Sequence, residues 1–398
     1  MKSKSIAEQK IKWFEWFLPW RLPHKLRTHF IINLVIGIVI ALVFHVMESK
    51  NWGEGITNIG FDLMVRYENK LAHTNYFEDT NSTLFFIDIT KHTFKEWGEP
   101  YITPRSRIAR LINFAVKCKA NVVILDILLE KADCYDPNGD KELKSVIHNL
   151  VTENIPTKII IPLRIDSDGV INKTIIDDLI AEDTKLVKDK KKKARTIYTA
   201  VPTVTATPDD LVVRYWSVYQ MGTENGLKKI VWSIPMVACS LFSKGSIDDL
   251  ERAASSILSN KSLGTNHEVD KELVVNFSLP AKTVMIPRVG SSTHDEIYTQ
   301  RIRYKVPRDL SEKFVVNKID LGTILLTADQ ILAPQNDVLP VKNLDNRIVL
   351  IGVSSPDARD MHQTVIGQIP GMYILGNSIN TDFRDDKPDN TELMAKTT

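Results

Sequence analysis

Residues 122–130 read VVILDILLE, an apolar run of the kind found in a buried strand, interrupted by a charge at Asp126. A second run, LFFIDIT at residues 84–90, has the same form, with Asp88 in the equivalent place. Near-continuous apolar runs are typical of strands in a parallel sheet that is covered on both faces. A carboxylate at the end of such a strand needs a polar partner, so the two aspartates predict a shared polar site or a shared structural pairing.

The sequence around these runs predicts strands that alternate with helices. TPRSRIARLINFAVKCKA, from residue 103, indicates a helix with Thr103 as N-cap and Pro104 at the first helical position. The apolar positions at helical spacing in this segment and in the next predicted helix are Ile108, Leu111, Ile112 and Ala115, then Leu143, Val146, Ile147 and Leu150. TKIIIPL from residue 157 and RIVLIGVSS from residue 347 add strands, and PGMYILGNSINTDF adds a helix. This alternation predicts an α/β fold with a largely parallel sheet covered by helices.

Composition and charge narrow the class of protein. The chain has 398 residues, of which 43% are hydrophobic, and a formal net charge of +2, which suits a globular protein with a large core. The basic residues are dispersed apart from the N-terminus and the run KDKKKKAR at residues 188–195, so we expect no nucleic-acid partner. We interpret that run as a solvated loop between two elements. The three cysteines form neither a metal-site signature nor a disulfide framework.

An apolar stretch near the N-terminus predicts a membrane anchor. Residues 28–47 read THFIINLVIGIVIALVFHVM and contain no Asp, Glu, Lys or Arg. At about 1.5 Å per residue, such a helix crosses a hydrocarbon core of about 30 Å. A cleaved signal peptide is the competing interpretation, but no small-x-small cleavage pattern follows. Seven Lys and Arg residues precede the stretch against Glu8 and Glu15, which favours a cytoplasmic N-terminus, and Trp13, Trp16 and Trp20 resemble an interfacial aromatic belt.

The expected organisation has four parts, in a bacterial inner membrane protein with a single span. They are a cytoplasmic basic and aromatic segment at 1–27, the transmembrane helix at 28–47, a periplasmic or extracellular α/β domain at 50–383 and a polar tail at 384–398. A second apolar segment, IVWSIPMVACSLF from residue 230, is too short to span a membrane and contains Pro235, so we expect a buried helix there.

Polar residues at the predicted strand ends form the candidate site. Asp88, Asp126 and the loop that carries Asp360 and His362 follow strands whose carboxyl ends meet at one edge of a parallel sheet. Arg105 lies in the first turn of its helix, where the macrodipole disfavours a cation, so we expect Asp88 or Asp126 to pair with it. The alternative is that the aspartates cap turns and that the pairing is architectural.

Signatures of catalysis are weak in this sequence. Asp357, Asp360 and His362 could join the strand-end carboxylates in a metal site, but their spacing does not identify a metal. There is no glycine-rich phosphate loop, no GxSxG and no HExxH. We therefore expect neither an enzyme nor a cofactor.

The order of several motifs is similar to that of a known family. The motifs are FDLMVRYENKL, FIDI, WGEP, TPRSRIARLI, VVILDILLE, PDDLVVRYW and RIVLIGVSSPDARDMHQTVIGQIPGMYILGNSI. Over residues 50–383, least so at 243–300, the chain resembles the type-two CHASE domain, an extracytoplasmic sensory domain of bacterial receptors that precedes cyclases and kinases. The resemblance implies a stimulus-sensing module and carries over no ligand. The positions that match recurrent family residues are Asp88, Trp97, Pro104, Arg105, Asp126, Arg214, Gly352, Asp360, His362, Thr364, Pro370 and Gly371.

Family receptors return through the membrane to an output domain, and no such spans follow here. We therefore expect either a piece of a receptor or, as the favoured interpretation, a protein that acts through a partner. The expected function is ligand or partner binding by an anchored sensor, as a homo-oligomer or with a second membrane or periplasmic protein. The expected site consists of Asp88, Trp97, Arg105, Asp126, Asp360 and His362. The alternatives are a structural subunit of a cell-envelope complex and a metal-dependent hydrolase.

Overall fold

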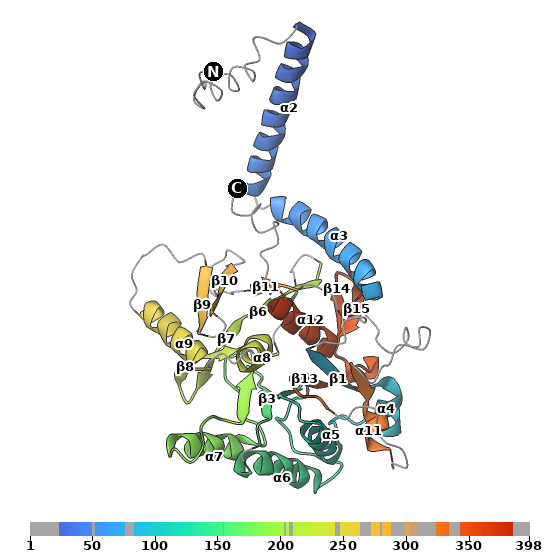
Figure 1. Ribbon diagram of the computed structural model, residues 1–398, viewed down its shortest axis with the longest axis vertical. Coiled ribbons are helices and arrows are strands. Elements are labelled where there is room, and N and C mark those ends of the chain that lie inside the picture. The colour runs from blue at the N-terminus through green and yellow to red at the C-terminus, as the bar shows by residue number, and fades with distance from the viewer. Residues whose placement is uncertain are drawn as a thin grey trace, which may run out of the picture. The chain divides into compact units, whose positions relative to one another are not determined.

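The computed structural model of the chain (Figure 1) falls into two compact units, Met1–Met64 and Val65–Thr398. The residues that it describes are 24–49, 52–75, 83–153, 155–202, 204–206, 210–242, 247–262, 272–278, 281–287, 299–302, 304, 306, 324–333 and 343–384. The predicted aromatic belt at Trp13, Trp16 and Trp20 and the predicted tail beyond Arg384 lie outside the described residues.

The first unit contains helix α2 (His24–Ser49) and the beginning of helix α3 (Trp52–Asn75). The stretch predicted to span the membrane, residues 28–47, lies within α2, which confirms that it is helical. The described aliphatic side chains of α2, from Ile31 to Leu42, are between 45% and 58% exposed. Over the residues that the structure describes, no helix has both the length and the apolar character needed to cross a membrane.

A parallel sheet of six strands forms the centre of the second unit, in the order β12-β1-β13-β2-β3-β4. The strands are β1 (Leu84–Ile89), β2 (Val122–Leu125), β3 (Lys158–Pro162), β4 (Ile197–Ala200), β12 (Leu325–Thr327) and β13 (Ile348–Val353). Each predicted apolar run therefore forms a strand, and β13, late in the sequence, lies between β1 and β2. The predicted α/β class with a largely parallel sheet is confirmed.

Helices cover both faces of this sheet (Figure 1). One face packs against α5 (Arg105–Lys117), α6 (Gly139–Thr152), α7 (Asp177–Lys188) and α11 (Ala328–Leu332), and the short helix α4 (Lys91–Glu96) contacts β1. The other face packs against α8 (Ile234–Phe242) and α12 (Gly371–Arg384). Side chains alternate between the two layers, since Phe85 and Ile87 belong to the first core while Leu84 and Phe86 belong to the second. Neighbouring residues of one strand therefore point to opposite faces of the sheet.

Smaller sheets complete the unit on the α12 side. One has the order β11-β6-β14-β15, with β5 paired to β6. Its strands are β5 (Val204–Ala206), β6 (Val213–Ser217), β11 (Thr299–Arg301), β14 (Met361–Thr364) and β15 (Gly367–Pro370). The remaining elements are the pairs β7 (Tyr219–Glu224) with β8 (Leu227–Trp232) and β9 (Glu272–Ser278) with β10 (Ala281–Pro287), helix α9 (Ile247–Ser262) and the short helix η3 (Pro356–Ala358). The hairpin β14–β15 leads directly into α12.

Helix α5 begins one residue later than predicted. Its first residue is Arg105, and Pro104 occupies the cap position without a side-chain hydrogen bond, so the assignment of Thr103 as N-cap is wrong. The backbone of Pro104 is extended, with φ −57° and ψ 121°, so Pro104 takes the N-cap position and the helix begins only at Arg105. The capping acceptor is instead Asp133, whose Oδ2 accepts the Arg105 backbone N–H at 2.9 Å. Because Asp133 lies 28 residues further along the chain, no short sequence motif predicts that it caps α5.

The basic run at 188–195 is only partly a solvated loop. Lys190, Lys191 and Lys193 are exposed, as predicted, but Lys192 is buried. Its ammonium lies 2.7 Å from Oδ1 of Asp183, which is completely buried. This pair anchors the connection between α7 and β4, because Asp183 Oδ2 also accepts the backbone N–H groups of Thr196 and Ile197 at 2.6 and 2.8 Å.

Candidate functional site

The predicted convergence of polar residues at the carboxyl edge of the sheet is present in the structure. Asp88 stands in register with Gly352 of β13, and the backbone N–H of Asp126 donates to the carbonyl of Ile351 at 2.8 Å. The two aspartates therefore flank Gly352 on strands that are two spacings apart, about 10 Å. All three positions belong to the set of residues that faces α12, because they alternate with those that face α5.

The N-terminus of α12 lies against this row, and two glycines allow the approach. A Cβ atom on Gly352 would lie 2.8 Å from Cβ of Met372 and 3.2 Å from Cβ of Asp126. A Cβ atom on Gly371, the first residue of α12, would collide with the carboxylate of Asp360. The backbone N–H of Gly371 donates to the carbonyl of Asp360 at 2.9 Å. A carboxylate at this end of a helix is favoured by the helix dipole.

Asp126, Asp360 and His362 form one electrostatically coupled group, here called the strand-end group. His362 Nε2 and Asp360 Oδ1 are 2.9 Å apart, and both side chains are partly exposed. Burial raises the pKa of Asp126 to about 7; the charge of Asp360 adds to this effect and the charge of His362 opposes it. The hydrogen bond to Asp360 raises the pKa of His362, partial burial opposes this, and the charges of Asp360 and Asp126 add to it. Asp126 therefore exchanges its proton near neutral pH, and His362 holds its proton to a higher pH than an ordinary histidine does.

Asp88 has a different and more structural environment. It is almost completely buried, and its Oδ2 accepts hydrogen bonds from Ser354 Oγ at 2.9 Å and from the Tyr373 hydroxyl at 2.8 Å. The Tyr373 ring packs edge-on against Phe86, with centroids 5.5 Å apart. Asp88 thus joins β1 to the loop after β13 and to α12. Sequence reasoning missed Ser354 and Tyr373, although both fall inside the motifs that carry the family resemblance.

Arg105 does not pair with Asp88 or Asp126, so this expectation is wrong. Its Nη2 donates to the carbonyls of Leu128 and Lys131 at 2.9 and 3.3 Å. Burial lowers the pKa of Arg105, and the nearby carboxylates of Asp140 and Asp133 oppose this effect. The physical reason is the sheet itself: α5 covers one face, whereas the strand-end aspartates point to the other.

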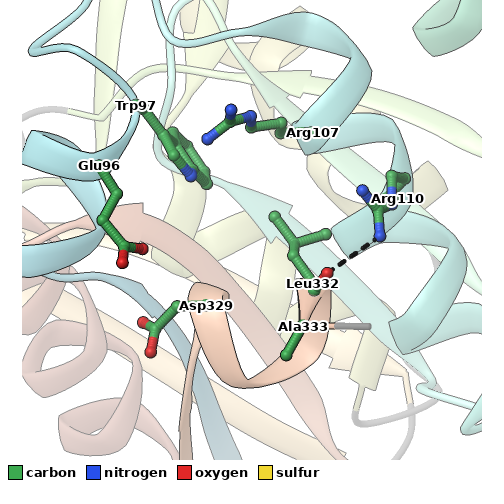
Figure 2. Close-up of a pocket in the computed structure, with 7 residues that line it drawn as sticks. All are labelled: Glu96, Trp97, Arg107, Arg110, Asp329, Leu332 and Ala333. Carbon is green, nitrogen blue, oxygen red and sulfur yellow. Dashed lines mark hydrogen bonds between the residues drawn. The ribbon is translucent and has the colours of Figure 1, made fainter. Parts of the chain in front are cut away.

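Trp97 lies apart from the other predicted residues, on the α5 side of the sheet. It caps the C-terminus of α4, and Cζ of Arg107 lies 4.8 Å from the centroid of its ring. Both side chains line a pocket of about 500 Å³ between α4, α5 and α11 (Figure 2). The six predicted site residues are therefore divided among the strand-end group with the neighbouring Asp88, the Arg105 cluster and this pocket.

The described side chains at the strand ends are not arranged as a metal site. Within the described part of the chain, no group of three or more His, Cys, Asp or Glu side chains is placed to hold a metal ion. Asp357, one of the residues considered for such a site, has a carboxylate oxygen 3.9 Å from Lys91 Nζ instead.

Comparison with known proteins gives one match. A family model described as the CHASE2 domain matches residues 35–389, most of the chain. No curated protein and no solved structure matches. The resemblance that the order of the sequence motifs predicted is confirmed.

Proposed function

Because the chain belongs to the CHASE2 domain family, we propose that it is a membrane-anchored sensory protein of a bacterial signalling system. The family consists of extracellular sensory domains of signalling proteins and is not a catalytic family. The proposed anchor is the apolar stretch at residues 28–47, with the N-terminus in the cytoplasm and the α/β domain in the periplasm or outside the cell. The uncharged apolar sequence and the basic residues that precede it support this topology.

The strand-end group is the feature that supports a sensory role for this fold. Asp126, Asp360 and His362 place titratable side chains at the edge where parallel sheets hold their ligands, and at the start of a helix that packs on the sheet. Protonation, or contact with a ligand or partner, would change the charge at this helix terminus. The stimulus is therefore proposed to act on how α12 and the hairpin β14–β15 meet the sheet.

Contacts lead from this hairpin to the part of helix α3 that belongs to the second unit. His362 lies on β14, and at the turn between β14 and β15 the carbonyl of Val365 accepts a hydrogen bond from Arg66 Nε of α3 at 2.8 Å. Asn69, one turn further along α3, donates to the carbonyl of Tyr304 at 2.6 Å and is buried. Displacement of the hairpin would therefore act on α3, which follows α2 in sequence.

The output is proposed to involve a second copy of the chain or a second membrane or periplasmic protein. A shift of a single helix transmits a signal only if a neighbouring helix or domain contacts it differently in the two positions. The occurrence of the family in signalling proteins supports such a coupling.

Replacing His362 by glutamine in the host tests the proposal. The substitution removes the titratable ring at a partly exposed position, and His148→Gln is the matched control because His148 forms a similar pair with Glu182, at 3.3 Å on the helical layer. We expect His362→Gln to alter cyclic nucleotide levels or the phosphoproteome while His148→Gln does not. If both variants are folded and give the wild-type profile, the strand-end group does not receive the stimulus.

A further inference from the structure

The pocket beside Trp97 has a charge pattern that selects one class of small molecule. Its lining consists of Glu96, Trp97, Arg107, Arg110, Asp329, Leu332 and Ala333. Two carboxylates and two guanidinium groups therefore face the same space, and its volume of about 500 Å³ is typical of small-molecule sites. Figure 2 shows the carboxylates on one side of the pocket and the guanidinium groups on the other, with the indole and Leu332 between them.

Hydrogen bonds and ion pairs with neighbouring residues position the charged side chains of the lining. Some of their oxygen atoms and N–H groups take no part in these contacts and can bind a ligand. Asp329 Oδ1 accepts from Thr93 Oγ1 at 2.6 Å, which fixes its carboxylate against α4. Arg110 Nη2 donates to the carbonyl of Leu332 at 3.2 Å, which leaves its other N–H groups available. Among the residues that the structure describes, the Glu96 carboxylate has one ion-pair partner, His92 at 3.7 Å, and this pair is exposed. These contacts involve one oxygen of each carboxylate and one nitrogen of Arg110.

Arg107 is the least satisfied member of the lining. It is partly buried and its guanidinium lies over the Trp97 ring, yet it makes no hydrogen bond to any residue that the structure describes. Burial and the nearby charge of Arg110 lower its pKa, whereas Glu96 raises it. A guanidinium has five N–H donors and is suited to bind a carboxylate through two of them. Its environment therefore favours an added anionic group.

We propose that this pocket binds a small zwitterion, such as an amino acid or a short peptide with free ends. The ligand carboxylate would bind Arg107 and Arg110, its ammonium group would bind Glu96 and Asp329, and its apolar body would contact Trp97 and Leu332. Polyanions are disfavoured by the two carboxylates and polycations by the two guanidinium groups, because like charges in a partly desolvated pocket repel. This site lies on the opposite face of the sheet from the strand-end group and does not depend on it.

Calorimetric titration of the detergent-solubilised full-length protein tests the assignment. The probes are the twenty L-amino acids and the dipeptide Leu-Leu, followed by the N-acetyl and amide analogues of the tightest binder. Each analogue keeps the apolar body and removes one charge. We expect at least one zwitterion to bind with a Kd below about 1 mM, and each analogue to bind about tenfold or more weakly, as expected for loss of a charged hydrogen bond.

Variants locate the two charges of the ligand. Arg107→Gln should weaken binding of the zwitterion about tenfold or more, while Arg164→Gln, an exposed arginine outside the pocket, should not. Glu96→Gln should weaken binding of the zwitterion but not of its N-acetyl analogue, which lacks the ammonium group. Absence of binding by every zwitterion, binding of either single-charge analogue as tight as that of the zwitterion, or full affinity in Arg107→Gln would each overturn the proposal.

Discussion

Replacing Asp126 by asparagine should remove most of the dependence of the domain's stability on pH between 5 and 8. The pKa of this carboxyl is about 7 in the folded state, against an ordinary value of 3.8. Between these values the folded state binds a proton that the unfolded state does not. The free energy of unfolding therefore falls as the pH rises through this range and levels off above pH 7.

The magnitude follows from the shift. One pKa unit corresponds to about 1.4 kcal/mol, so a shift of about three units corresponds to about 4 kcal/mol. His362 acts in the same direction: its pKa is raised in the folded state, so its contribution is present below the unfolded value near 6.5 and is lost as the pH rises through the folded value. Asparagine at position 126 stays neutral and imitates the protonated acid. The variant should exceed the wild type by about 2 kcal/mol at pH 5, where the unfolded carboxyl is already ionised, and by about 4 kcal/mol at pH 8.

Urea unfolding of the full-length protein in detergent, followed by tryptophan emission at pH 5, 6.5 and 8, measures this difference. The reporter is well placed, because Trp216 is completely buried in the core that contains α12. Asp345→Asn is the control, since Asp345 is exposed and its substitution should leave the wild-type slope unchanged. A wild-type slope in Asp126→Asn, or a wild-type stability that is constant or rises between pH 5 and pH 8, would contradict the raised pKa of Asp126.

Two further predictions concern packing and the buried ion pair, and both are measured as shifts in the urea midpoint. Gly352→Ala should destabilise the fold by about 1–3 kcal/mol because its methyl group would lie 2.8 Å from Cβ of Met372, whereas Gly60→Ala, where nothing lies within 4 Å, should not destabilise it. Lys192→Met should cost about 3–5 kcal/mol because it leaves Asp183 buried without its cation, and a loss below 1 kcal/mol would contradict the role given to this pair.

The sheet and its covering helices could be predicted from the sequence because they depend on local periodicity. Apolar runs such as residues 122–125 form buried strands, and Ile108, Leu111 and Ile112 lie on the buried face of α5 as their spacing indicated. The cap of α5 could not be predicted, since Asp133 reaches it from a distant loop. The burial of Lys192 depends likewise on a partner nine residues away.

For the candidate site, the sequence predicted only that polar residues lie at the ends of the strands and not which of them contact one another. The sequence placed Asp88 and Asp126 at one edge, but it did not reveal which face α5 would cover, and this decides that Arg105 cannot reach them. The approach of Asp360 to Asp126 depends on how the hairpin β14–β15 packs, which no local pattern encodes. The pocket at Trp97 requires α11, more than 200 residues further along the chain.

Gentle detergent extraction of the full-length protein from its own host membranes, with mass spectrometry of the co-purifying proteins and a native mass, tests the sensory assignment most directly. We expect the chain to be recovered from the membrane fraction with a signalling component, such as a cyclase or a kinase, carried on the same polypeptide or on a partner. Recovery in a fixed stoichiometric assembly with structural envelope proteins alone would contradict it.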